Sequence, residues 1–211
     1  MERFSDALIY ETNIQRKKTI KSRLEMIRRE NIDVMYSAGI DLETCKKEFI
    51  DSVVNTYEIW NDSYGYITLL WYVSVAYLLN VDSDIVNKIV SMYKISMIQD
   101  SLIETILSKM DNSVMVSDAI CCPKLERPLL DIIYSREKRN SIYIKDFIEK
   151  EWYDLYADAP WYDSHRRDDN LYKGYWCFEI GAIVKLLSID DTLLKDIRYY
   201  PYDMVNFQKD R

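Results

Sequence analysis

The chain has 211 residues and carries 35 acidic against 28 basic residues, a formal net charge of −7. Apolar residues make up 48 % and charged residues 30 %, values that are ordinary for a globular protein and argue against disorder. The acidic balance argues against nucleic acid or an anionic membrane as the partner, because phosphate groups repel it, and favours a basic protein.

Glycine and proline are scarce, at four each, which favours long helices over the many tight turns of an all-β fold. The four cysteines lack the spacing of a zinc site and fit a reducing cytosol. The charged N-terminus has no apolar segment of the kind found in secretory signals. The longest apolar run, 67–81, is shorter than the ~20 residues of a membrane span. We therefore expect an all-α, cytoplasmic helical bundle.

The first half of the chain shows a succession of helical patterns. Apolar residues recur at steps of three and four between Leu42 and Trp60, which predicts a helix lying on a core. The segment 64–79 is apolar nearly all round and is expected to be central. Asp41 and then Asp82 or Ser83 are expected to cap helices. The predicted helices are 4–32, 42–60, 64–79, 82–97 and 101–110.

The second half is less regular at first. Pro123 and Pro128 favour a helix start and disfavour a helix interior, so a short helix is expected around Leu129 to Ile133. The one clear loop is 158–170. Further helices are predicted at 141–156, 171–187 and 190–197.

A shift of 108 residues aligns the two halves weakly. It brings Tyr64 onto Tyr172 and Ile85 onto Leu193. The chain is then either two similar helical halves packed together, or the similarity is the chance likeness of amphipathic helices. We place the domains at 1–110 and 111–211.

The single histidine, His165, lies in a loop with three acidic residues, Asp163, Asp168 and Asp169. Carboxylates and an imidazole in one loop allow the hypothesis of a metal-dependent hydrolase. One histidine does not supply the two-histidine spacing of a zinc protease, and polar loops of this kind are usually solvated. We therefore favour a protein without a metal or other cofactor that is not an enzyme.

The segment 172–187 has unusual residues for a helix. Gly174 and Gly181 each cost about 1 kcal/mol against alanine in a helix, which predicts close approach of another backbone. Glu179 falls at the margin of the apolar face, where a carboxylate needs a partner. It is either a structural clamp to an arginine, a tyrosine or a backbone N–H, or a catalytic acid. Cys177 among aromatic residues is expected to fill the core.

Basic residues gather near the N-terminus, interleaved with glutamates. The cluster is either a phosphate-binding surface or, the interpretation we favour, a solvated helix face. It consists of Arg16, Lys17, Lys18, Lys21 and Arg23.

Three elements together resemble one family. They are Tyr172–Ala182 with its GYWCFE core, Tyr200–Asp203 (YPYD), and Trp161–His165. These elements resemble the C-terminal domain of the PoNi immunity proteins, and the long polar helix with the apolar helix 64–79 is similar to the family's N-terminal domain. The resemblance implies an all-helical cytosolic protein that binds a PoNe-type DNase toxin, blocks its active site or its DNA path, and needs no cofactor.

The toxin-facing surface is expected where carboxylates and aromatic rings are densest outside the core helices. An acidic inhibitor can occupy the basic DNA-binding surface of a nuclease, as a monomer or a homodimer. The expected contact residues are Asp154, Asp158, Tyr162, Asp163, Asp168 and Asp169. The motif residues expected to form the scaffold are Gly174, Trp176, Glu179, Pro201 and Tyr202. An ordinary acidic surface loop is the alternative, and Asp82, Asp84 and Glu58 offer another acidic face.

Overall fold

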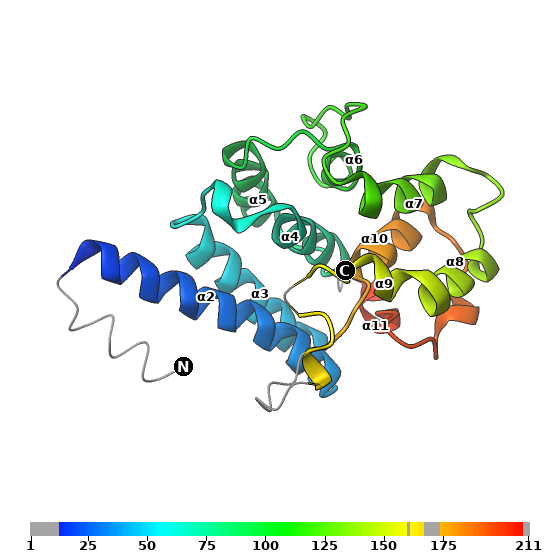
Figure 1. The fold of residues 1–211 in the computed structure, drawn as a ribbon, viewed down its shortest axis with the longest axis horizontal. Helices are drawn as coiled ribbons and strands as arrows, with labels where there is room; N and C mark the ends of the chain where they lie inside the picture. Colours follow the sequence, from blue (N-terminus) through cyan, green and yellow to red (C-terminus); the bar gives the residue numbers. More distant parts are fainter. Residues whose placement is uncertain (1–12, 160, 167–173, 209–211) are drawn as a thin grey trace.

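The computed structural model describes residues 13–159, 161–166 and 174–208, and these residues form helices and turns without a β-strand (Figure 1). The all-α prediction is therefore confirmed. The α-helices are α2 (Ile14–Ser37), α3 (Leu42–Tyr57), α4 (Tyr66–Leu78), α5 (Ser83–Ile95), α6 (Ser101–Leu107), α7 (Pro123–Tyr134), α8 (Ser141–Phe147), α9 (Tyr153–Leu155), α10 (Phe178–Leu187) and α11 (Tyr202–Val205). Short 3-10 turns are η1 (Asp62–Tyr64), η3 (Ser164–Arg166) and η4 (Thr192–Leu194), and η2 (Ile148–Trp152) is a π turn.

Side-chain caps fix where several helices begin. The carboxylate of Asp41 accepts a hydrogen bond from the backbone N–H of Thr44 at 2.9 Å, which starts α3 as predicted. Asn140 caps α8 in the same way. Helix α5 begins at Ser83, directly after Asp82, at the predicted place, but the Asp82 side chain makes no capping hydrogen bond. Local sequence therefore determines these boundaries.

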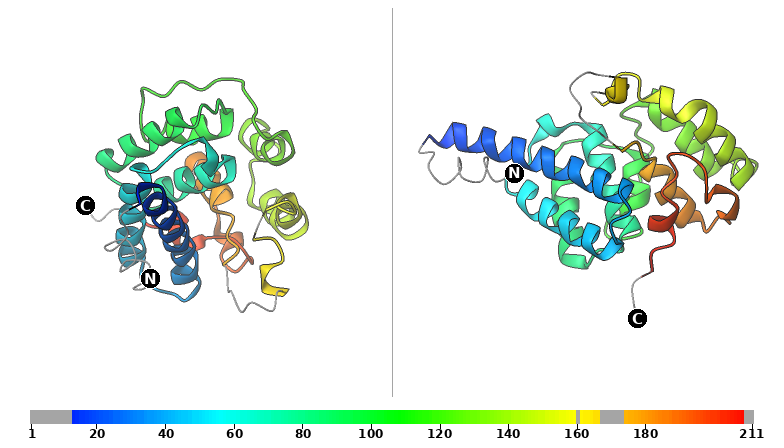
Figure 2. Two further views of the ribbon diagram at one scale, coloured as in Figure 1. Left: turned by 60° about the vertical axis from the view of Figure 1, so that its left-hand side comes forward. Right: turned by 90° about the horizontal axis from the view of Figure 1, so that it is seen from below.

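Helix α4 is the centre of the core, as its composition predicted. Nine of its residues are buried, and α5, α6 and α10 pack around it (Figure 2). Helices α2 and α3 lie side by side, and the N-terminal end of α2 projects beyond the other helices (Figures 1 and 2). The buried apolar side chains of all these elements form one continuous cluster.

Helix α10 packs against both α4 and the α11 region. A Cβ at Gly181 of α10 would lie 2.8 Å from Pro201 Cγ and 3.1 Å from Val205 Cγ2, so only glycine fits. The glycine thus accommodates side chains of the α11 region, and not another backbone as the sequence suggested. The Lys185 ammonium donates to the carbonyl of Leu78 at 2.7 Å, at the C-terminal end of α4. Burial lowers the pKa of Lys185 to about 8.

Four predicted segments differ in the structure. Helix α2 continues to Ser37, past the predicted end at 32, and residues 1–12 lie outside the described part. Residues 174–177 have no regular secondary structure, so α10 begins at Phe178 and not at 171. The segment 190–197 holds only the turn η4. Pro128 lies inside α7, where it forgoes one backbone hydrogen bond near the helix start.

The internal repeat is not carried through the structure. A shift of 108 residues places α10 on the second half of α4, and these two helices pack against each other. The helix that follows α4, α5, would correspond to 191–203, which contains only η4 and the start of α11. The two halves are therefore not copies of one helical unit.

Two buried carboxyl groups meet where α6 and α7 begin. Asp100 caps α6, accepting hydrogen bonds from the Ile103 backbone N–H at 2.8 Å and from the Tyr66 hydroxyl at 3.3 Å. Glu126, in the first turn of α7, accepts the backbone N–H of Cys122. Burial, followed by a hydrogen bond with Asp100, raises the pKa of Glu126 to about 8. A carboxyl with this pKa is largely protonated at neutral pH, which avoids a second negative charge beside Asp100.

Glu126 should make the stability of the fold depend on pH. The unfolded carboxyl loses its proton near the ordinary value of 4.5, whereas the folded one keeps it to about pH 8. The unfolded state binds fewer protons within this window, so the free energy of unfolding falls as pH rises, by at most about 1.4 kcal/mol per pH unit. Urea unfolding between about pH 5 and about pH 8 measures this slope.

Glu126→Gln should reduce that slope, because the amide does not titrate. The control Glu151→Gln changes an exposed carboxylate and should leave the slope as it is. Equal slopes for Glu126→Gln and the unmodified protein would contradict the assignment of the buried proton to Glu126.

Candidate functional site: an acidic and aromatic face

The predicted helix 141–156 is present as one continuous run of α8, the π turn η2 and α9. A π turn holds one residue more than an α turn and is frequent at functional sites. Trp152 and Tyr156 point inward and are buried, while Asp154 and Asp158 are exposed. Residues 141–158 contain five acidic and two basic residues. The exposed acidic residues of this run are Asp146, Glu149, Glu151, Asp154 and Asp158.

The segment 161–166 folds back on this helix through its aromatic rings. Tyr162 lies with its ring centroid 4.6 Å from that of Tyr153, and Trp161 lies 5.1 Å from Tyr156. Tyr175, from the irregular stretch before α10, packs at 5.5 Å against Trp161. Three segments of the chain are thereby joined into one aromatic cluster.

Tyrosine hydroxyls hold the carboxylates above the rings. Tyr162 donates to Asp154 at 2.9 Å, and Tyr153 donates to Asp163 at 3.0 Å. These hydrogen bonds fix the positions of both carboxylates without adding a positive charge. Asp163 also pairs with Arg166 at 2.9 Å. We call Asp154, Asp158, Tyr162 and Asp163 the acidic face.

Asp163 adopts a left-handed backbone conformation, with φ of 54°. Aspartate tolerates this region better than most residues, because its short side chain can bond locally. The backbone N–H of Asp163 donates to the Tyr153 hydroxyl at 3.1 Å. The turn therefore directs both the backbone and the carboxylate of Asp163 toward Tyr153.

The Tyr175 hydroxyl lies at the junction of this loop. It is 2.8 Å from the Ser164 hydroxyl, 3.0 Å from the backbone N–H of His165, and 3.0 Å from His165 Nδ1. These contacts attach the loop to the stretch that leads into α10. The His165 imidazole therefore contacts Tyr175, whereas the Asp163 carboxylate contacts Arg166 and Tyr153.

Beneath the aromatic cluster lies the buried carboxylate of Glu179, on α10. Its Oε1 accepts hydrogen bonds from the Trp152 indole at 2.6 Å and from the Tyr156 hydroxyl at 2.8 Å. Burial raises the pKa of Glu179, while the two donors act in the opposite direction. Glu179 thus fixes the two inward-facing rings that support the acidic face.

Glu179→Ala should destabilise the fold, because two buried donors lose their acceptor. Each unsatisfied donor costs about 1–3 kcal/mol, so we expect the free energy of unfolding to fall by about 3 kcal/mol or more. Glu179→Gln retains an acceptor oxygen at the same place and should lose about 1 kcal/mol. Chemical unfolding followed by near-ultraviolet circular dichroism measures both. Equal losses for the two variants would show that the missing acceptor oxygen does not account for the lower free energy of unfolding.

The structure joins three of the six expected contact residues, Asp154, Tyr162 and Asp163, through Tyr153. Asp158, one turn after Asp154, is exposed and pairs with Lys124 of α7 at 3.3 Å. Asp168 and Asp169 lie outside the described residues. The alternative face is elsewhere: Asp82 and Asp84 are exposed at the start of α5, and Glu58 pairs with Lys21 of α2.

The expected scaffold residues lie in the interior or at its edge. Gly174 leaves no room for a Cβ, which would lie 2.8 Å from the Asp33 carbonyl oxygen of α2. The Trp176 indole donates to the Ser37 hydroxyl at 2.9 Å. Pro201 is buried against Gly181, and Tyr202 is half-buried in α11.

Of the two tyrosines that orient the carboxylates, the sequence analysis named Tyr162 and missed Tyr153. Tyr153 lies one residue before Asp154, and no local pattern indicates its hydrogen bond to Asp163. The only available signal was the aromatic density of 152–162, which marked the region but not the pairs.

A metal site finds no support in the described residues, where no three histidine, cysteine or acidic side chains gather in a metal-binding arrangement. In the same residues no helix is long and apolar enough to cross a membrane.

Comparison with known families assigns the chain to the class of immunity proteins. The family model described as "PoNe immunity protein (PoNi), N-terminal" matches residues 5–91, and "PoNe immunity proteins (PoNi), C-terminal" matches 98–204. The chain therefore belongs to the PoNi family of PoNe immunity proteins, as its motifs suggested, and confers immunity against a PoNe nuclease toxin. Comparison with curated proteins and with solved structures found no match.

Proposed function

We propose that the acidic face is the surface with which this immunity protein contacts its toxin and covers the surface that the nuclease uses for DNA. The observation that carries the proposal is the presence of oriented carboxylates on a rigid aromatic support. Asp154 and Asp158 are exposed, and Asp163 is half-exposed. The protein would act in the cytoplasm, as a monomer or a homodimer.

Charge complementarity supports this assignment. A nuclease that binds DNA presents a basic surface to the phosphates, and carboxylates can occupy the same positions. The run 141–158 supplies an excess of three negative charges, five acidic against two basic residues. Such a field accelerates association and selects against wrong partners.

The aromatic residues supply binding energy in the complex, whereas the charges mainly accelerate association. Binding energy concentrates in a few residues, and tyrosine and tryptophan are enriched among them. Tyr162 and Trp161 are half-exposed beside the carboxylates. Because their neighbours already hold them, few side-chain rotations are lost when the toxin binds.

The direct experiment pairs this protein with its cognate PoNe toxin in an inactive form. A stoichiometric complex by co-purification, together with protection of DNA from the active toxin, supports inhibition by binding. DNA degradation that proceeds unchanged in the presence of a complex would show that the toxin is bound away from its DNA surface.

Charge reversal at the acidic face tests whether the toxin binds there. Asp154→Lys with Asp158→Lys should slow association with the inactive toxin by about tenfold or more at low salt, because both side chains would then repel a basic surface. The difference should shrink as salt is raised, since screening shortens the reach of the charges. Stopped-flow or surface plasmon resonance measurements give the rates.

The matched control reverses two exposed carboxylates elsewhere, Asp82→Lys with Asp84→Lys on α5. This variant has the same net charge as the first and should associate at close to the unmodified rate. Slower association in the α5 variant alone would place the toxin on that other face.

A further inference from the structure

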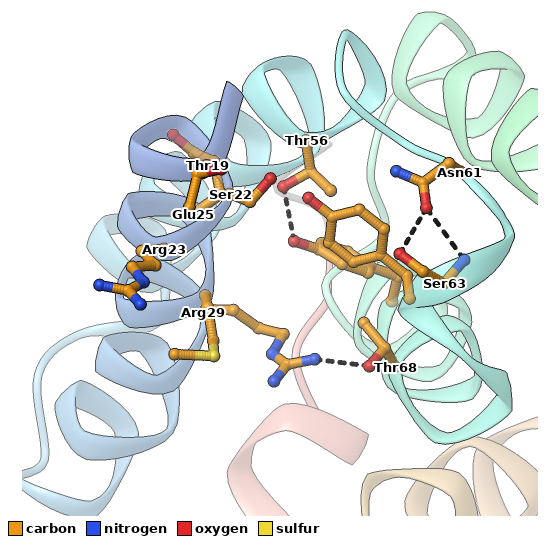
Figure 3. Close-up of a pocket in the computed structure, with 12 residues that line it drawn as sticks. Thr19, Ser22, Arg23, Glu25, Arg29, Thr56, Asn61, Ser63 and Thr68 are labelled. Atoms are coloured by element: carbon orange, nitrogen blue, oxygen red, sulfur yellow. Dashed lines mark hydrogen bonds between the residues drawn. The ribbon is translucent and has the colours of Figure 1, made fainter. Parts of the chain in front are cut away.

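A cavity of about 340 Å³ lies between the middle of α2 and the segment that joins α3 to α4 (Figure 3). Its volume falls within the range of small-molecule sites. The walls carry side chains from α2, α3, η1 and α4, among them Ser22, Arg23, Arg29, Thr56, Tyr64 and Thr68. It is separate in sequence from the acidic face, which is built from α9 and the segment 161–166.

The uncompensated charge in this cavity is positive. Arg29 is half-buried and donates to the Thr68 hydroxyl at 2.8 Å (Figure 3), and Arg23 is exposed at the rim. Neither guanidinium pairs with a carboxylate in the part of the chain that the structure describes. Glu25 also lines the cavity, but both of its oxygens accept from Arg28, at 3.1 and 3.3 Å.

The inner wall adds a hydrogen-bond donor. The Tyr64 hydroxyl is buried, and although Ser22 lies near it, no group of the described residues meets it with normal hydrogen-bond geometry. By contrast, the Tyr72 hydroxyl lies 2.9 Å from Ser52 and 3.0 Å from Thr56, so that part of the wall is already satisfied. A buried hydroxyl without a partner gains from a ligand oxygen that accepts its proton.

We propose that this cavity binds a small anion that carries a carboxylate or phosphate group. The anion would accept hydrogen bonds from the remaining N–H groups of Arg29 and from Tyr64, with Arg23 closing the rim. Guanidinium groups suit both anions, because their planar donors match two oxygens at once. The chain as a whole is acidic, with a net charge of −7, whereas the unpaired charges of this cavity are positive. The need for solubility does not explain such a local excess of positive charge.

Titration with inorganic phosphate and, separately, with citrate tests the proposal. Isothermal calorimetry should show saturable binding of at least one of them to the unmodified protein, with a rise in Tm. Sodium chloride at matched ionic strength should give neither effect, which separates a site from general screening. Phosphate alone or citrate alone would identify which anion the cavity prefers.

Arg29→Met should weaken that binding by tenfold or more, because it removes the charge and keeps the length of the side chain. Arg23→Met, at the exposed rim, should weaken it by several-fold and decides the question if the first variant does not fold. The control Arg127→Met changes an exposed arginine of α7 and should bind as the unmodified protein does. Absence of saturable binding, or equal binding by all variants, would overturn the proposal.

Discussion

The packing of α4 against α10 is the contact on which the rest of the molecule depends. α4 lies in the segment that matches the N-terminal family model, and α10 in the segment that matches the C-terminal one. An apolar helix such as α4 is stable in water only when neighbours cover it, and α10 supplies one of those surfaces. Gly181 permits the tight fit of the α11 region on α10, and Lys185 joins the end of α4 to α10. The two matched segments therefore share one core.

That contact also determines the geometry of the acidic face. α10 carries Glu179, two positions before Gly181, and Glu179 fixes Trp152 and Tyr156 from below. Those rings in turn support Trp161 and the loop that carries Asp163. A buried carboxylate with two aromatic donors is costly unless its partners are in place, so loop and core are coupled through one side chain.

The sequence predicted the elements whose signals are local. Apolar periodicity located α3 and α4, and capping residues located the start of α3. The stretch 174–177 looked helical because its apolar residues continue the pattern of α10. Its true conformation is determined by α2, since Trp176 bonds to Ser37, 139 residues away in the chain. The same limit applies to the site: the position of Asp163 was evident, but its bond to Tyr153 depends on a loop closure that periodicity does not encode.

Glu25 and Asp154 differ in the group that satisfies each carboxylate. Glu25 is paired with Arg28, so its charge is neutralised where it lies. Asp154 is held instead by Tyr162, a neutral donor, and that hydrogen bond raises the pKa of Tyr162, which keeps the proton on the hydroxyl. A neutral donor fixes the carboxylate and leaves its full charge facing solvent. The entropy of ordering that side chain is then spent during folding and not during association, so a basic partner meets a charge already in position.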